Sequence, residues 1–273
     1  MNSFPLPGAP VFHRSENGAL MIEDLGLDEL AQEHGTPLFV YSQAAIESAL
    51  SAWQRGLAER DALVCYAVKA NSSQAILSLL AQAGCGFDIV SGGELARALA
   101  AGAEPGKIVF SGVGKTRREM QAALEAGIGC FNVESEAELL ALNDVAAACG
   151  LTAPVSIRVN PDVDARTHPY ISTGLRDNKF GIAHDHALAA CQLAASLPGL
   201  RVAGIGCHIG SQITEAAPYL DALERVLDLL EAIEAAGVPL GQIDLGGGLG
   251  IAYADETPPA ADALCQMMAR GEY

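Results

Sequence analysis

Residues 86–133 have the sequence GFDIVSGGELARALAAGAEPGKIVFSGVGKTRREMQAALEAGIGCFNV, in which short β-branched runs alternate with helix signals. The runs at 86–90, 107–111 and 129–133 are mostly apolar, which is typical of parallel strands covered on both faces. Between these runs the sequence contains two motifs that start a helix and two glycines that are expected to end one. A strand, a helix, a glycine and another strand form the repeating unit of a parallel α/β sheet.

Three helices are predicted by a Ser or Thr that stands three residues before a Glu. The pairs are Ser91 with Glu94, Thr116 with Glu119, and Ser135 with Glu138. This spacing predicts a capping box, in which each side chain accepts a hydrogen bond from the backbone N–H of the other residue. The same helices are predicted to end at glycines in the left-handed conformation, namely Gly102, Gly127 and Gly150. Apolar residues at helical spacing predict a further helix at about 219–236.

The same alternation continues in both directions along the chain and predicts seven strands in all. The other four lie at 62–68, 155–159, 202–209 and 242–245. Seven successive βα units favour a TIM-type (β/α)8 barrel over an open doubly wound sheet. After a last helix at about 259–270 the sequence stops, so we expect the eighth strand to be absent. A barrel cut short after seven strands would leave two sheet edges unpaired.

The N-terminal segment does not fit this alternation. Two short strands are predicted at 11–13 and 19–22, followed by a short helix around 27–34. A lone strand pair needs another sheet to join. We therefore expect residues 1–35 to pair with a β domain that lies beyond the C-terminal residue, and residues 36–273 to form the incomplete barrel.

Composition and charge exclude several classes of protein. The chain is 50% hydrophobic and only 18% charged, which excludes a disordered chain, and no apolar run reaches the roughly 18 residues that cross a bilayer. The 16 Lys and Arg against 33 Asp and Glu give a net charge of −17, so we expect neither nucleic acid nor membrane as a partner. The 7 cysteines include no Cys-x-x-Cys pair, which predicts a cytoplasmic protein without disulfides or structural zinc.

In a βα barrel the functional residues gather at the C-terminal ends of the strands. Lys69 follows the first barrel strand, where partial burial would make its amine nucleophilic, although a lysine that only reaches to the surface is an equal alternative. His208 follows the sixth strand and either stacks on a planar group, moves a proton or simply packs. The glycines of 246–250 follow the seventh strand and form either a phosphate cradle or a tight turn.

Together these three features indicate pyridoxal phosphate, which needs a lysine amine, a phosphate site and groups that flank its ring. No metal site is predicted. His184 and His186 stand two residues apart at the start of a helix, so their side chains point in different directions. Glu94 is equally well explained as the capping partner of Ser91.

Four motifs resemble the barrel of the alanine racemase-fold decarboxylases, which depend on pyridoxal phosphate. They are YAVKAN at 66–71, GFDIVS at 86–91, HIGSQ at 208–212 and GGGLG at 246–250. Three further motifs resemble the diaminopimelate decarboxylases within that family, namely NPDVD at 160–164, HPYISTG at 168–174 and NKFG at 178–181. The resemblance extends from about residue 10 along nearly the whole chain. It implies decarboxylation of meso-2,6-diaminopimelate to L-lysine and carbon dioxide, the last step of lysine biosynthesis.

The resemblance also implies a role for individual residues. The catalytic candidates are Lys69, which would carry the cofactor on its amine, its neighbour Asp88, and His208, which would stack on the ring. The cofactor-binding candidates are Lys69, Arg158, His208, Ser211, Gly246, Gly247 and Gly248, with Arg158 beneath the cofactor and the last four on the phosphate. The loop from His168 to Lys179 would lie over the site and help to admit a diamino diacid substrate.

Two parts of the family pattern do not occur in this sequence. One is an eighth strand with a Glu-Pro-Gly-Arg motif, and the other is a β domain whose Cys reaches the partner's site in a homodimer. We therefore expect a homodimer at full length and weak or no activity from this chain alone. Two alternatives stay open: a related decarboxylase of arginine, ornithine or a carboxylated polyamine, and a non-catalytic barrel that binds a partner.

Overall fold

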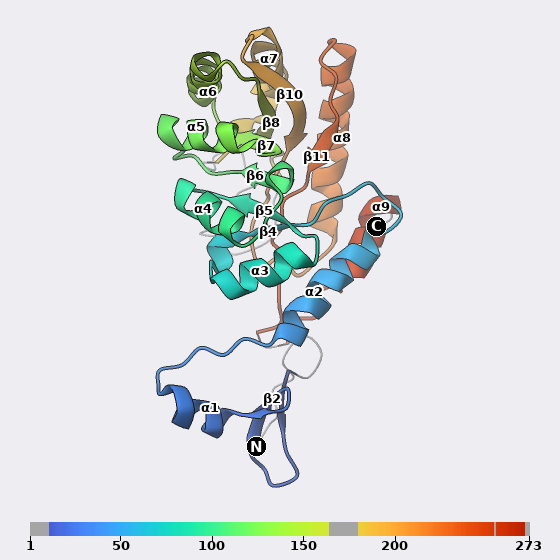
Figure 1. Ribbon diagram of the computed structural model, residues 1–273. Coiled ribbons are helices and arrows are strands. Elements are labelled where there is room, and N and C mark those ends of the chain that lie inside the picture. The colour runs from blue at the N-terminus through green and yellow to red at the C-terminus, as the bar shows by residue number, and fades with distance from the viewer. Residues whose placement is uncertain (1–10, 164–179, 254, 271–273) are drawn as a thin grey trace.

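A curved parallel sheet forms the centre of the computed structural model, which describes residues 11–163, 180–253 and 255–270 (Figure 1). Its main strands follow one another across the sheet in chain order: β4 (Cys65–Ala67), β5 (Gly86–Ile89), β6 (Ile108–Phe110), β7 (Cys130–Val133), β8 (Ala153–Asn160), β10 (Leu200–Gly206) and β11 (Gln242–Asp244). Each of them overlaps a predicted run, and β8 and β10 begin two residues earlier than predicted, so the parallel βα sheet is confirmed. The short strand β9 (Ile182–Ala183), which pairs with the end of β8, was not predicted.

Helices alternate with the strands and lie along the outer side of the sheet (Figure 1). They are α2 (Gln43–Gly56), α3 (Gln74–Gln82), α4 (Gly92–Ala100), α5 (Arg117–Ala126), α6 (Glu136–Cys149), α7 (His184–Ser196), α8 (Ala217–Ala235) and α9 (Ala261–Arg270). Two 3₁₀ turns, η1 (Val68–Ala70) and η2 (Pro105–Lys107), complete the set of described elements in this part of the chain. The predicted helices at about 219–236 and 259–270 are confirmed as α8 and α9.

The three predicted capping boxes form to different extents. Thr116 and Glu119 make the complete box at the start of α5. Ser91 and Ser135 each accept a hydrogen bond from the expected Glu backbone, but the Glu side chains bind elsewhere: Glu94 accepts from the N–H of Val90, and Glu138 accepts from the N–H of Glu134. The prediction of a reciprocal box is therefore wrong at these two helices, because each carboxylate binds one residue further upstream.

The predicted helix-ending glycines are confirmed by their backbone angles. Gly127 and Gly150 are the left-handed C-caps of α5 and α6, and Gly102 has a φ of 91° just after α4. This conformation costs glycine little because it has no Cβ.

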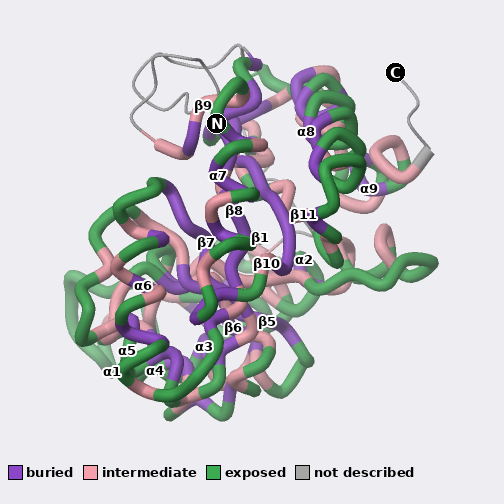
Figure 2. Tube along the Cα trace, turned by 90° about the horizontal axis from the view of Figure 1, so that it is seen from above, coloured by how far each residue is buried: buried purple, intermediate pink, exposed green. Residues whose placement is uncertain are grey.

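The sheet is packed on an apolar core and is strongly curved. The largest fully buried side chains include Phe87, Phe110 and Phe131 on three successive strands, and most of β7, β8 and β10 is buried (Figure 2). Asn132 on β7 donates a hydrogen bond of 2.9 Å to Asp244 on β11, although β8 and β10 lie between these strands in the sheet. The sheet therefore curls far enough for side chains of distant strands to meet inside it.

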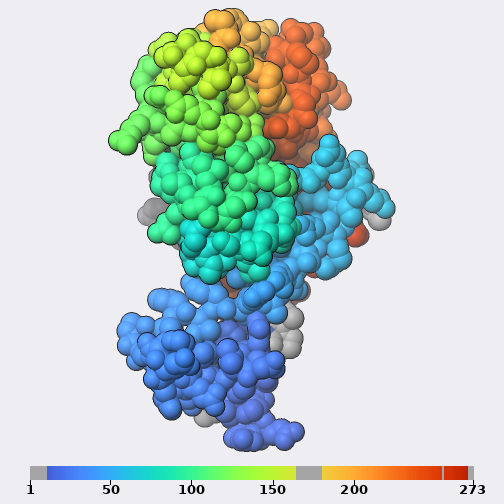
Figure 3. Space-filling view, viewed as in Figure 1, coloured from blue at the N-terminus to red at the C-terminus, as the bar shows by residue number. Residues whose placement is uncertain are grey.

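The N-terminal residues form a small lobe beside the barrel (Figures 1 and 3). It contains an antiparallel sheet and one helix, with the elements β1 (Phe12–Arg14), β2 (Leu20–Ile22), β3 (Leu25–Gly26) and α1 (Leu27–His34). The predicted strand pair and helix are confirmed, whereas β3 was not predicted. Glu23 accepts hydrogen bonds from Ser42 Oγ at 2.5 Å and from the N–H of Ala44 at 3.1 Å, which ties this lobe to the start of α2.

The order of the main strands begins at β4 and ends at β11, so each of these two has a strand neighbour on one side only among the described residues. The 7 cysteines are all free thiols in this structure. In the described part of the chain, we find no helix with the length and apolar character that crossing a membrane requires.

Candidate active site

The predicted site residues lie at the C-terminal ends of the strands. Asp88 and Arg158 lie near the ends of β5 and β8, Lys69 lies in η1 directly after β4, and His208 and Gly246 follow β10 and β11. Because parallel strands share the direction of their ends, all of these residues face the same rim of the barrel. The predicted loop from His168 to Lys179 lies outside the described residues.

Asp88 is surrounded by the other charged residues of this rim. Burial raises the pKa of its carboxyl group to about 6; a hydrogen bond from Ser111 opposes this rise, and the nearby Asp244 carboxylate adds to it. The positive charges of Lys69 and Arg158 also act to lower the pKa. Asp88 therefore lies within electrostatic reach of both predicted cationic residues.

His208 is affected by the same two cations. Burial, together with the positive charges of Arg158 and then Lys69, lowers the pKa of its imidazole to about 4. The ring is therefore neutral at pH 7 and a poor proton donor. Of the functional alternatives from the sequence, stacking of a neutral ring on a planar group agrees best with this environment.

Of the two alternatives left open for Lys69, the structure agrees with a lysine that reaches the surface, because the residue is exposed. The 3₁₀ turn η1 carries Lys69 out of the sheet just after β4, which has a strand neighbour only on the β5 side among the described residues. No hydrogen bond or ion pair links Lys69 to another described residue. The amine is therefore accessible at the rim, within electrostatic reach of Asp88 and His208.

The loops after β10 and β11 run side by side, joined by hydrogen bonds from Ile213 N to Gly248 O and from Gly250 N to Ile213 O, both 2.9 Å long. A Cβ on Gly248 would lie 2.0 Å from the carbonyl oxygen of Gly210, and a Cβ on Gly246 would lie 2.9 Å from Nδ1 of His208. Only glycine allows this approach at both positions. The glycine run is thereby brought against His208 and the exposed Ser211, as the predicted site requires.

Sequence analysis missed Asp244, whose carboxylate lies inside the barrel. Its Oδ2 accepts from Asn132 and its Oδ1 accepts from the N–H of Gly246, both at 2.9 Å. Asn132 also donates to Ser111 Oγ at 3.1 Å. Gly206 offered a signal, because a Cβ there would lie 2.8 Å from the Cβ of Asp244, so the glycine makes room for this side chain.

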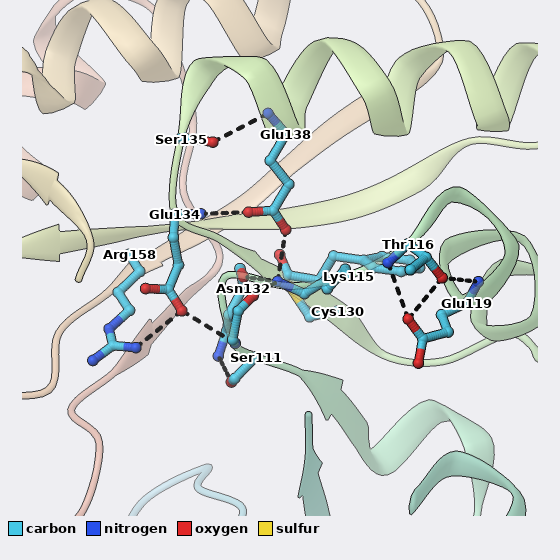
Figure 4. A network of polar contacts seen from close by, with 12 residues as sticks. Ser111, Lys115, Thr116, Glu119, Cys130, Asn132, Glu134, Ser135, Glu138 and Arg158 are labelled. Carbon is cyan, nitrogen blue, oxygen red and sulfur yellow. Dashed lines mark hydrogen bonds and ion pairs between the residues drawn. The ribbon is translucent and has the colours of Figure 1, made fainter. Parts of the chain in front are cut away.

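A second polar network, which contains Glu134 and Lys115, lies next to the rim residues (Figure 4). Glu134, directly after β7, forms an ion pair of 3.0 Å with Arg158. The side chain of Lys115 is fully buried and forms an ion pair of 2.6 Å with Glu138. Its ammonium also donates to the carbonyl oxygens of Gly112 and Asn132, both at 2.7 Å. Buried ions of this kind persist only when they are paired and hydrogen-bonded.

The residues of the rim fit pyridoxal phosphate. Oδ1 of Asp88 is buried and forms no hydrogen bond within the described part of the chain, so it has an acceptor left over. At Gly247 nothing lies within 4 Å of the position that a Cβ would take, which leaves open space beside a run of backbone N–H groups. An accessible amine, a neutral imidazole, an arginine and a glycine loop are the donor set that the cofactor needs.

The raised pKa of Asp88 predicts a pH-dependent cost to folding. The unfolded chain loses this proton near the ordinary pKa of 3.8 and the folded chain near 6, so the folded state binds more protons between these values. The contribution of Asp88 to stability therefore falls by about 3 kcal/mol in all as the pH rises from below the lower pKa to above the upper one, and about 2 kcal/mol of this fall lies between pH 4 and 6. Asp88→Asn has no carboxyl group to titrate at this position. Its free energy of unfolding, relative to that of the parent chain, is therefore expected to rise over this pH range.

Urea unfolding of both proteins at several values between pH 4.5 and 7.5 measures this difference. The lowered pKa of His208 acts in the opposite direction, because the unfolded chain takes up the extra proton. This effect is present in both proteins and cancels in the comparison. A stability difference that is constant with pH would contradict the environment described for Asp88.

Comparison with known proteins agrees with this arrangement. A family described as "Pyridoxal-dependent decarboxylase, pyridoxal binding domain" matches residues 43–270. The diaminopimelate decarboxylase of Vibrio cholerae is 56% identical over 248 residues, which are 91% of this chain and 60% of that protein. The corresponding enzyme of Pseudomonas aeruginosa is 57% identical over 242 residues, covering 89% of this chain and 58% of that protein.

Solved structures give the same result for the fold. Diaminopimelate decarboxylase from M. jannaschii in co-complex with L-lysine matches with a TM-score of 0.90 and 37% identity, over 96% of this chain and 62% of that one. The fold is the alanine racemase-type β/α barrel that the sequence predicted. This chain spans about 60% of the length of the curated relatives that it matches. The chain belongs to the family of pyridoxal-dependent decarboxylases and carries the pyridoxal-binding domain of that family.

Proposed function

We propose that this chain is the cofactor-binding part of a diaminopimelate decarboxylase, which converts meso-2,6-diaminopimelate to L-lysine and carbon dioxide. The proposal rests on one observation. Lys69, Asp88, Arg158 and His208 lie together beside the glycine loop at one rim of the barrel. The relatives at 56% and 57% identity bear that enzyme's name. The matching structure from M. jannaschii contains L-lysine.

In this proposal each residue of the rim has one task. Lys69 holds the cofactor through its amine, Arg158 lies beneath the cofactor, and the neutral ring of His208 packs on the face of the pyridine. Asp88 places a carboxyl group beside the amine of Lys69. Pyridoxal phosphate supplies an electron sink for the electron pair that carbon dioxide leaves behind.

The phosphate is assigned to the loops after β10 and β11. Ser211 offers a hydroxyl group, and Gly247 and Gly248 offer backbone N–H groups, beside the open space at Gly247. Gly246, whose own N–H donates to Asp244, holds the turn that brings this loop to the phosphate. Backbone N–H groups that lie close to one another favour a bound anion. The half-buried thiol of Cys65 and the buried thiol of Cys207 take no part in the chemistry, since loss of contact with water raises the pKa of each to about 12.

We also propose the organisation of the full-length protein. Residues 1–35 form a unit distinct from the barrel of residues 36–273 and pack against a β domain outside this chain. The exposed Leu20 and Leu25 of the N-terminal lobe support this, because packing against another sheet would cover them. We further propose a homodimer and a cytoplasmic location, which the free thiols favour.

Chemical labelling tests the central part of the proposal. Pyridoxal phosphate is added to the chain and fixed with borohydride, and the modified residue is mapped by peptide mass spectrometry. We expect the label on Lys69 and its complete loss in Lys69→Ala. Lys107→Ala is the matched control, because Lys107 forms its ion pair with Glu104 at the opposite end of β6 and is expected to leave the label unchanged. A label on another lysine would refute the assignment.

Competition with candidate substrates tests the choice of substrate. Diaminopimelate is expected to reduce the labelling of Lys69 at lower concentration than arginine or ornithine, because its amine competes for the same cofactor and its second carboxylate is recognised as well. Equal competition by ornithine would favour a related decarboxylase. A chain without any pyridoxal absorbance change would favour a non-catalytic barrel.

A further inference from the structure

We propose that Glu134 is a positioning residue, which fixes the guanidinium group of Arg158 at the rim and acts on the cofactor site through Arg158 alone. This inference rests on the proposed function, because it concerns the same site. The proposed function itself gives Glu134 no task.

The carboxylate of Glu134 joins three separate parts of the rim. Its Oε1 accepts from Nη1 of Arg158 at 3.0 Å and from the N–H of Gly112 at 3.1 Å, and its Oε2 accepts from the N–H of Gly181 at 3.2 Å. The side chain is only 2% exposed. A carboxylate buried to this extent needs donors on both oxygens, and one of these donors is a cation.

Arg158 is held from a second side as well. Its guanidinium carbon lies 5.4 Å from the centre of the Phe180 ring, which is a cation–π contact, and its side chain is 17% exposed. Glu134 and Phe180 together leave this group little rotational freedom. The charge of Arg158 acts on both Asp88 and His208, so its position affects two groups of the site at once.

Glu134 is itself fixed by the network behind it (Figure 4). Its backbone N–H donates to Glu138 at 3.0 Å, and Glu138 in turn pairs with the buried Lys115. Lys115 also donates to the carbonyl oxygen of Gly112, and the N–H of Gly112 donates to Glu134. The carboxylate of Glu134 is thus held in a fixed position, and Arg158 is the member of the network that lies toward the cofactor site.

Nuclear magnetic resonance of arginine side chains tests the positioning directly and needs no cofactor. In the 273-residue chain with labelled arginine, the Nη protons of Arg158 are expected to give separate signals, because Glu134 slows rotation of the guanidinium group. Glu134→Gln removes the charge and is expected to merge these signals. Glu119→Gln is the matched control, since Glu119 also binds two backbone N–H groups, those of Gly92 and Thr116, but no arginine.

A double-mutant cycle tests the second half of the proposal. Glu134→Gln is expected to weaken binding of pyridoxal phosphate about tenfold in the parent chain, and less than about twofold when Arg158 is already Met. Glu119→Gln is expected to leave the affinity unchanged. If Glu134→Gln does not fold, Glu134→Asp serves instead, because it keeps the charge but is one methylene too short to reach all three donors.

The two measurements separate the inference from the proposed function. Unchanged Arg158 signals in Glu134→Gln would overturn the inference whether or not the cofactor binds. Losses of affinity that simply add in the double mutant would also overturn it, because Glu134 would then act independently of Arg158. A parent chain that binds no pyridoxal phosphate would contradict the proposed function and leave the side-chain signals to decide the inference.

Discussion

Replacement of Lys115 by methionine is expected to lower the free energy of unfolding by about 3–5 kcal/mol, the cost of breaking a buried ion pair by removing one partner. The side chain of Lys115 is 0% exposed, and its ammonium donates to Glu138 at 2.6 Å and to the carbonyl oxygens of Gly112 and Asn132 at 2.7 Å. It also lies 5.6 Å from the centre of the Phe110 ring. Methionine has a similar length but leaves the Glu138 charge uncompensated and takes one donor away from each of the two carbonyl groups.

Urea unfolding followed by circular dichroism measures this loss. Two further variants show whether it comes from the buried ion pair. Glu138→Gln in the Lys115→Met background is expected to recover part of the stability, because it removes the uncompensated charge. Arg117→Met is the matched control in the first turn of α5: its ion pair with Asp144 is 59% and 61% exposed, so a loss below about 1 kcal/mol is expected. Equal losses for Lys115→Met and Arg117→Met would contradict the role given to the buried pair.

The capping motifs mark the boundary between what local sequence determines and what it does not. Ser135 begins α6 as predicted, because the hydroxyl group and the N–H that it binds lie three residues apart. The side chain of Glu138, however, turns to Lys115, which is 23 residues away in the sequence. Spacing along one helix carries no information about such a partner, so the reciprocal half of the box could not be predicted.

The site shows the same boundary. The strand ends could be predicted, because continuous apolar runs followed by polar residues are a local pattern, and this pattern identified Lys69 and His208 as candidates. Asp88 and Arg158 were assigned from the family resemblance. Asp244 was missed because its partner Asn132 is 112 residues away and is reached only through the curvature of the sheet. The exposure of Lys69 likewise depends on which strands flank β4, not on the residues around Lys69 itself.

Gly248→Ala is expected to destabilise the loops that form the proposed phosphate site, by about 2–4 kcal/mol. Gly248 has a φ of 104°, which alanine rarely adopts, and its new Cβ would lie 2.0 Å from the carbonyl oxygen of Gly210. The contact is with backbone, so no side chain is able to move aside and the loops after β10 and β11 must separate. Their separation would break the 2.9 Å hydrogen bond from Ile213 N to Gly248 O. Binding of pyridoxal phosphate is expected to be lost together with stability.

Gly247→Ala next to it separates stability from binding. Its φ lies outside the left-handed region and nothing lies within 4 Å of the added Cβ, so a change in unfolding free energy of less than about 1 kcal/mol is expected. The open space beside Gly247 is where we propose that the phosphate binds, and a methyl group there is expected to weaken binding without unfolding the chain. Urea unfolding and absorbance titration with pyridoxal phosphate, run on both variants, give the two values. Parent-like affinity in Gly247→Ala would place the phosphate elsewhere, and parent-like stability in Gly248→Ala would contradict the close approach of the two loops.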